Sequence, residues 1–369
     1  MTAAATGEPV EIDEELKRRE DDLAETDEYD ESPPSDIVAF NELRSCSDLK
    51  RLHDAGQLQI QPDFQREVVW EASQQTRFID SLAKQLPIPS MCISLDYKTD
   101  SRQVVDGLQR MSAIIKFLSD RKWRLSGLKD VDHRIANKTV EYIEQHNPEI
   151  INRVENTVIP VTVLRCDLSK RSHQEYLFTI FHRLNTGGLK LNNQEIRNCI
   201  YSGQFNDMLK SVVWSETSMS LFGLSPGRKY RFSNEELFLR ILAFNDGYES
   251  YKGPLSKFLN EYMSKFRSSS DDLIADKRAI LESALSLIYE KMLAGEPFPR
   301  LSRATIEAIF IGVIRNISVL SSMDQKDLYE RYIELRSNDA FSIEALKEGL
   351  AAPDRVKERL NTAIAIFGR

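Results

Sequence analysis

Apolar residues recur in two different rhythms along this chain. Up to residue 170, short runs rich in β-branched residues alternate with helical patterns, and beyond it apolar residues recur every three or four positions. The strand-like runs are 91–97, 103–105 and 157–165, each bordered by turn-forming residues. The pattern predicts an α+β fold class, with a small mixed αβ head followed by a mostly helical body.

Two amphipathic segments lie between the strand-like runs of the head. Residues 73–86 begin at Ser73, a favourable helix N-cap, and stop before Pro87. Residues 108–118 place Leu108, Met111 and Ile114 on one arc of a helix, which is typical of a face that packs on a core.

The second half predicts a series of helices separated by Gly, Ser and Pro. The expected helices are 169–184, 193–214, 234–244, 254–266, 271–293, 302–319 and 325–335. Asn192 followed by Glu195 matches a capping box at the start of one of them. No repeat of fixed period is present, so the pattern does not favour a solenoid.

Charge is distributed unevenly along the chain, so the acidic pI of 5.4 does not argue against an anionic partner. Residues 1–36 carry 14 acidic and three basic side chains, a net charge of −11. Since the whole chain has a net charge of −8, the other 333 residues carry a net charge of +3. We expect residues 1–35 to be a disordered acidic tail with room for a helical stretch within residues 11–24, and to serve either as a solubilising arm or as a nucleic-acid mimic that occupies a basic groove. The predicted domains are this tail, an αβ head at 36–170 and a helical domain at 171–369.

Composition excludes several classes of protein. No apolar run approaches the ~18 residues of a membrane span, and the first residues lack the pattern of a signal peptide. The four cysteines are far apart, which disfavours a disulfide framework and indicates a reducing, cytoplasmic location. Neither common phosphate-binding glycine loop is present. All five histidines precede residue 183, so the second half cannot form a histidine-based metal nuclease site.

The strongest chemical signal is the run from Val105 to Arg110. A strand ends at Val105, Gly107 permits a sharp turn, and a helix follows at once, so exposed backbone amides and Arg110 together suit an anion. Asp106 could hold a metal ion or a water near a phosphate. The alternative is structural: Asp106 caps the helix and Arg110 pairs with a surface carboxylate.

Two further segments could contribute to the same pocket. Gln65 and Arg66 precede an aromatic turn, and Arg66 together with Arg110 could grip a phosphate chain, although Arg66 could equally stack on Trp70. Asn185 and Thr186 could form another wall, or this stretch could simply end a helix. The basic clusters 121–124 and 228–231 could hold phosphates and stack on a base, or be solvated turns.

The order of these motifs resembles the N-terminal domain family of GmrSD-type modification-dependent restriction systems. The resemblance rests on PDFQREVVW, IDSLAKQLPIPS, VVDGLQRMSAI and FTIFHRLNTGGLKLNNQEIRN, followed by FSNEELFLRIL and GPLSKFLNEYM, and it spans roughly residues 45–270. That family is similar to the ParB/sulfiredoxin fold. The resemblance implies a nucleoside-triphosphate site that contains Asp106, Gly107, Gln109 and Arg110, with Gln65 and Arg66 nearby. We expect Mg²⁺ to accompany the nucleotide, held mainly by its phosphates.

The chain departs from the family in two ways. Leu108 replaces the first Gln of the usual Asp-Gly-Gln-Gln-Arg motif, and losing a hydrogen bond to a charged group costs about 1.5–3 kcal/mol, so hydrolysis could be weakened. The histidine-containing nuclease domain of many relatives is also missing, so we expect a standalone member whose separate partner, a nuclease or other defence protein, cuts DNA.

Three functions therefore remain open from the sequence. The first is a regulatory component of a restriction or anti-phage defence system that binds, and could hydrolyse, a nucleoside triphosphate, with Asp106 and Arg110 as catalytic residues. The second is a non-catalytic DNA-binding module, whose affinity would fall steeply with salt. The third is a scaffold with a degenerate nucleotide site, which Leu108 favours.

Overall fold

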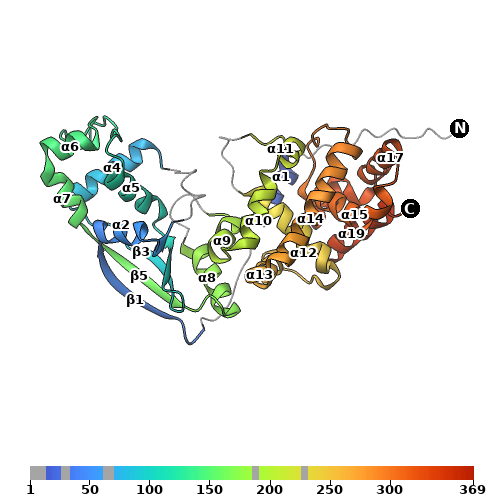
Figure 1. Cartoon of the computed structure of the whole chain (residues 1–369), viewed down its shortest axis with the longest axis horizontal. Helices are drawn as coiled ribbons and strands as arrows, with labels where there is room; N and C mark the ends of the chain where they lie inside the picture. Colours follow the sequence, from blue (N-terminus) through green and yellow to red (C-terminus); the bar gives the residue numbers. More distant parts are fainter. Residues whose placement is uncertain (1–13, 26–33, 61–69, 185–190, 226–231) are drawn as a thin grey trace. The chain divides into compact units, whose positions relative to one another are not determined.

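The structure, a computed structural model, describes residues 14–25, 34–60, 70–184, 191–225 and 232–369. It divides into two compact units, which we treat separately (Figure 1). Residues 31–191 form the αβ unit, whereas residues 1–30 and 192–369 together form the helical unit. The predicted α+β class, a sheet-containing head followed by a helical body, is confirmed.

One five-stranded sheet organises the αβ unit, in the order β1-β5-β3-β4-β2. Its strands are β1 Val38–Ser45, β2 Leu58–Gln59, β3 Met91–Asp96, β4 Ser101–Asp106 and β5 Val158–Cys166. β3 runs parallel to β5 and antiparallel to β4. The C-terminal ends of β3 and β5 therefore lie at the same end of the sheet. Asp106, at the C-terminal end of β4, pairs with Cys92 near the start of β3 and so lies at the opposite end of the sheet.

Most helices of this unit pack on one face of the sheet. They are α2 Cys46–Asp54, α4 Ala72–Ala83, α5 Leu108–Ser119, α6 Val140–His146 and α7 Pro148–Asn156. Helix α8 Arg171–Leu184 also belongs to this unit, but contributes no residue to the core on that face. The apolar stripes of α2, α4, α5 and α7 share a core with Ile93, Val104 and Val161 of the strands. This confirms the arc expected for 108–118, and Leu108 packs at the edge of that core.

Local differences from the expected elements have physical causes. Helix α4 is capped by Glu71, which shares a capping box with Gln74, so Ser73 is not the cap. The segment expected as one helix at 193–214 is two, because Gly203, at φ 145°, interrupts it. The expected helix 302–319 likewise breaks at Asn316.

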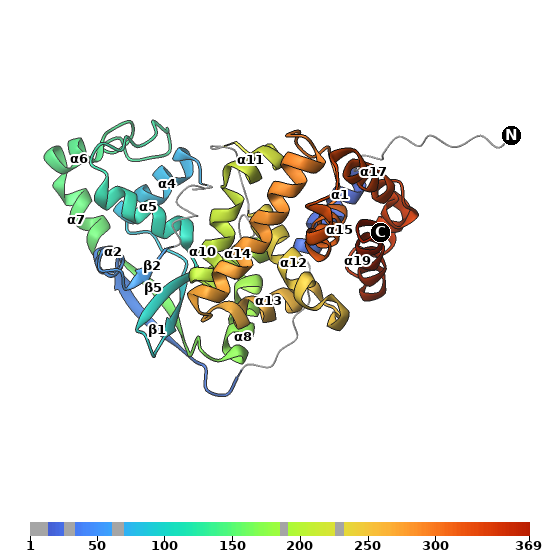
Figure 2. The ribbon, with the colours of Figure 1, turned by 45° about the vertical axis from the view of Figure 1, so that its right-hand side comes forward.

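The helical unit consists of helices packed side by side, as Figure 2 shows for α10 and α14. Its α-helices beyond residue 191 are α9 Asn193–Ile200, α10 Gln204–Val213, α11 Glu216–Phe222, α12 Ser233–Gly247, α13 Leu255–Phe266, α14 Asp271–Ser286, α15 Arg303–Arg315, α16 Ile317–Leu320, α17 Gln325–Arg336, α18 Ile343–Glu348 and α19 Pro353–Phe367. A π-helical turn, Leu287–Met292, continues α14. The predicted capping box of Asn192 and Glu195 opens α9 and is confirmed.

Part of the acidic N-terminal segment is helical, where the sequence left room for a helix within residues 11–24. Residues Glu14–Glu25 form helix α1, which packs in the helical unit with Leu16 buried. The carboxylate of Glu20 accepts the backbone N–H of Arg303 at 2.8 Å and that of Ala304 at 3.5 Å, while Ser302 accepts that of Thr305. Glu20 therefore completes the cap of α15, which explains why this part of the tail is ordered.

Among the residues that the structure describes, no helix combines the length and the apolar character needed to cross a bilayer.

Candidate functional site

The turn between β4 and α5 requires glycine at position 107. Gly107 adopts φ 97° and ψ 16°, a left-handed conformation that L side chains rarely enter. A Cβ atom there would also lie 2.7 Å from Cγ of Met91 and 3.2 Å from Nη2 of Arg110. Gly107 is thus fixed by both backbone conformation and space, which places α5 directly after the strand.

Backbone amides define the start of α5. The N–H of Met111 donates to the carbonyl of Gly107 at 2.9 Å, as the first bond within the helix. Within the described part of the chain, no side chain caps this terminus. The amides of Leu108, Gln109 and Arg110 therefore form an electropositive helix start, as the sequence predicted.

The structure brings Asp106 and Arg110 together as an ion pair. Nη2 of Arg110 lies 2.8 Å from Oδ2 of Asp106, and Nη1 donates to the carbonyls of Pro89 and Ser90. The Arg110 side chain is only 13% exposed, whereas that of Asp106 is 36% exposed. The guanidinium thus ties the end of β4 to the segment before β3. The structural interpretation of Arg110, pairing with a carboxylate, is confirmed, whereas Asp106 does not cap the helix.

Gln109 connects the helix start to a second predicted segment. Its side-chain oxygen accepts the backbone N–H of Trp70 at 3.2 Å, and the Trp70 carbonyl accepts from Gln75 at 3.1 Å. The Trp70 ring packs edge-on against Phe78, with centroids 5.5 Å apart. Trp70 is therefore held at both backbone groups and at its ring, next to the first turn of α5.

Of the remaining predicted site residues, the structure describes only the basic cluster 121–124. Gln65, Arg66, Asn185 and Thr186 lie outside the described residues, as does the basic cluster 228–231. The other basic cluster is described, and its Trp123 is buried beneath Lys116 rather than available to a base.

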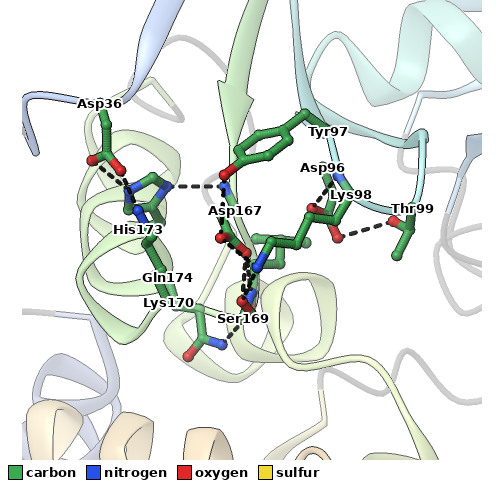
Figure 3. Close-up of polar contacts among 11 residues, drawn as sticks. Asp36, Asp96, Tyr97, Lys98, Thr99, Asp167, Ser169, Lys170, His173 and Gln174 are labelled. Carbon is green, nitrogen blue, oxygen red and sulfur yellow. Dashed lines mark hydrogen bonds and ion pairs between the residues drawn. The ribbon is translucent and has the colours of Figure 1, made fainter.

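A polar cluster that the sequence analysis missed lies at the other end of the sheet, where β3 and β5 end (Figure 3). The buried carboxylate of Asp167 accepts the N–H of Ser169 at 3.0 Å and its hydroxyl at 2.6 Å, and pairs with Lys98 at 2.9 Å. These contacts, led by the Ser169 hydroxyl, hold the pKa of Asp167 well below its usual range. The Asp-Leu-Ser sequence directly after β5 was the signal that could have revealed this turn.

His173 belongs to the same cluster and is held in one tautomer. Its Nδ1 accepts the backbone N–H of Asp167 at 2.9 Å, so Nε2 carries the proton and donates to Asp36 at 2.8 Å (Figure 3). Lys170 also pairs with Asp36, and these bonds hold the pKa of Asp36 at about 2. The pKa of Lys98 is raised by Asp167, so Lys98 stays charged and cannot act as a base towards Ser169. The cluster ties the entry of β1 to the start of α8.

Metal ligation from protein groups alone is not supported in the described residues, which contain no group of three or more His, Cys, Asp or Glu side chains able to hold a metal ion. A metal at the β4–α5 turn would have the carboxylate of Asp106 as its protein ligand and would need further oxygens from a bound ligand.

Comparison with known proteins adds one finding. Residues 49–202 match the family model of the GmrSD restriction endonuclease, N-terminal domain, a range that includes the β4–α5 turn and Trp70. No nuclease-domain model matches the rest of the chain. No curated protein and no solved structure gives a match. Residues 49–202 are therefore similar to the GmrSD restriction endonuclease N-terminal domain, and this similarity indicates a role in a restriction or defence system.

Proposed function

We propose that the αβ unit binds a nucleoside triphosphate at the β4–α5 turn and that this nucleotide regulates a restriction or anti-phage defence system. The observation that carries the proposal is the start of α5, where Gly107 allows a left-handed turn and three backbone amides precede the first helical hydrogen bond. Such a terminus favours phosphate through its amides and through the helix dipole.

The contacts of Arg110 change the role that we assign to it. Its guanidinium is engaged by Asp106 and by two backbone carbonyls, so it is a positioning residue rather than a phosphate ligand. By neutralising Asp106, it also removes the repulsion that a lone carboxylate would exert on an incoming phosphate. The cation that contacts phosphate is then Arg66, with Gln65 beside it.

The Trp70–Gln109 hydrogen bond supports the inclusion of Arg66. Only three residues separate Arg66 from Trp70 in the sequence, and Trp70 is fixed at the first turn of α5. Arginine suits this role because its planar, permanently charged fork can donate two parallel hydrogen bonds to a phosphate. We assign Asn185 and Thr186, which follow α8 in the sequence, to the same proposed site.

The donor set fits Mg²⁺ bound chiefly by phosphates. Oδ2 of Asp106 accepts a hydrogen bond from Arg110, and Oδ1 has no hydrogen-bond partner among the described residues. One carboxylate oxygen is the kind of ligand that Mg²⁺ takes when phosphates and waters supply the others. When bound, the ion would neutralise charge on the phosphates. Asp106 would hold it or position a water, and hydrolysis, if it occurs, would depend on that group.

DNA cutting is assigned to a separate nuclease or other defence protein. A direct role in DNA binding gains no support from the cluster at 121–124. Trp123 is buried, Arg121 pairs with Glu144, and Arg124 donates to the carbonyl of Asn137. The nucleotide site is therefore the function that the geometry supports best.

Calorimetric titration of the full chain with the common nucleoside triphosphates and Mg²⁺ tests the proposal. Arg66→Ala should weaken binding by about 10- to 100-fold, because a charge-assisted hydrogen bond contributes roughly 1.5–3 kcal/mol. Arg121→Ala, which removes an arginine that is 71% exposed in the same unit, is the matched control and should leave affinity unchanged. No binding by the unaltered chain, or equal affinity in all three proteins, would reject the site.

A further inference from the structure

The free edge of the sheet has an unusual composition. β1 is the terminal strand of the sheet order, and among the described residues its outer edge pairs with no other strand (Figure 1). Its eight residues include neither glycine nor proline. A long, unbroken edge strand presents unpaired backbone N–H and C=O groups and is a template for another strand.

Exposed apolar side chains gather at this edge. Leu43 is 72% exposed, Val38 47%, Phe40 39%, and Val158 on the neighbouring strand 48%. Leu43 lies opposite Pro160, which is also exposed, and Ser45 lies opposite Val158, so Leu43, Pro160 and Val158 share one face of the sheet, whereas Val38 and Phe40 lie on the other face. Clustered exposed apolar residues on a strand edge are typical of a surface that another protein covers.

The charges of β1 indicate which occupant the edge fits. Glu42 and Arg44 flank Leu43 and share the opposite face, where they form a two-bond ion pair at 2.8 Å. In an antiparallel pairing centred on Leu43, each Glu42 lies opposite Arg44 of the other copy. Leu43 meets Leu43, and Asn41 meets Ser45. Each pair within residues 41–45 is then complementary, whereas moving the centre of the pairing to residue 42 or 44 would place two like charges opposite each other.

We propose that β1 pairs antiparallel with β1 of a second copy of this chain about Leu43, joining two five-stranded sheets into one. The pairing is isologous, because the same strand serves both copies and a two-fold axis passes beside Leu43. The side chains of Leu43, Val158 and Pro160 from both copies then form one continuous apolar patch. This proposal does not depend on the nucleotide site.

A cysteine at the two-fold axis tests the register directly. Directly opposed residues of antiparallel strands have Cα atoms about 4.5–5.5 Å apart, within the range that a disulfide spans. The native cysteines are all buried, so an L43C variant should give disulfide-linked dimers on mild oxidation with little background. The control is L86C, since Leu86 is 49% exposed in the same unit but belongs to no strand.

Sedimentation of the full chain over a wide concentration range gives the second readout. Leu43→Lys should weaken the dimer by about tenfold or more, and the fold should survive because the side chain is already exposed. Glu42→Arg should lower the L43C cross-linking yield, and the E42R/R44E pair should restore it. A chain that stays monomeric, with L43C linked no more than L86C, overturns the proposal, as does a dimer insensitive to Leu43→Lys.

Discussion

Replacing Gly107 with alanine tests whether the β4–α5 turn is as constrained as the structure shows. Two costs add. A left-handed conformation costs an L residue about 1–2 kcal/mol, and the new methyl group would stand 2.7 Å from Cγ of Met91, which is itself buried. Forcing extra volume into a packed site costs about 1–3 kcal/mol. We therefore expect Gly107→Ala to lower the free energy of unfolding by about 2–5 kcal/mol.

Gly56 supplies a matched control in the same unit. It has φ +70°, but a Cβ atom there would meet nothing within 4 Å. Gly56→Ala should therefore incur only the conformational cost, about 1–2 kcal/mol, less the small gain from a stiffer unfolded chain. The difference between the two variants isolates the steric contribution at Gly107.

The assay is urea unfolding of the full chain, followed by tryptophan fluorescence, in which Trp70 and Trp123 report on the αβ unit and Trp214 reports on the helical unit. The comparison requires an unchanged dependence of the unfolding free energy on urea. Met91→Ala is itself destabilising because Met91 is buried, but in a double-mutant cycle the two substitutions together should cost less than the sum of their separate costs, because Met91→Ala removes the atoms that the methyl group meets. Equal destabilisation by Gly107→Ala and Gly56→Ala, within about 0.5 kcal/mol, would refute the steric argument.

Three further predictions follow from the contacts described. Burial raises the pKa of Glu20 to about 7 from 4.5, so docking of α1 should weaken as pH rises through that interval. Amide exchange of α1, corrected for intrinsic rates, should show this, and Glu20→Gln should abolish it. Burial also raises the pKa of Cys46 and Cys92 to about 12, so a disulfide reagent should modify these thiols only upon unfolding; fast reaction in the folded chain would contradict this. Leu108→Gln, which restores the family motif, should strengthen nucleotide binding or turnover, and no gain in either would favour a degenerate site.

Elements with strong local signals were predictable from the sequence. β3, β5 and α5 each have an uninterrupted period and clear borders, and the Asn192–Glu195 box sets the start of α9 by itself. The grouping of Asp106, Gly107, Gln109 and Arg110 also follows from spacing, because they occupy one strand end and one helical turn.

What the sequence could not predict depends on contacts between distant residues. β1 was missed because Asn41, Glu42 and Arg44 interrupt its apolar pattern, and its partner strand lies more than a hundred residues away. The partners of Arg110 include the carbonyls of Pro89 and Ser90, which no local pattern reveals. Helix α1 is held by Glu20 on the start of α15, a contact between distant residues that the charge pattern of the segment does not reveal.

The most direct test of the nucleotide site is hydrogen exchange of the full chain with and without Mg²⁺ and the nucleoside triphosphate that binds most tightly. Phosphates held at the start of α5 would accept the amides of Leu108, Gln109 and Arg110, so exchange at these three positions should slow when nucleotide is present. Amides of α13 in the helical unit serve as the internal reference and should not change. Nucleotide binding that leaves residues 108–110 unprotected, or no binding under any condition, would contradict the account.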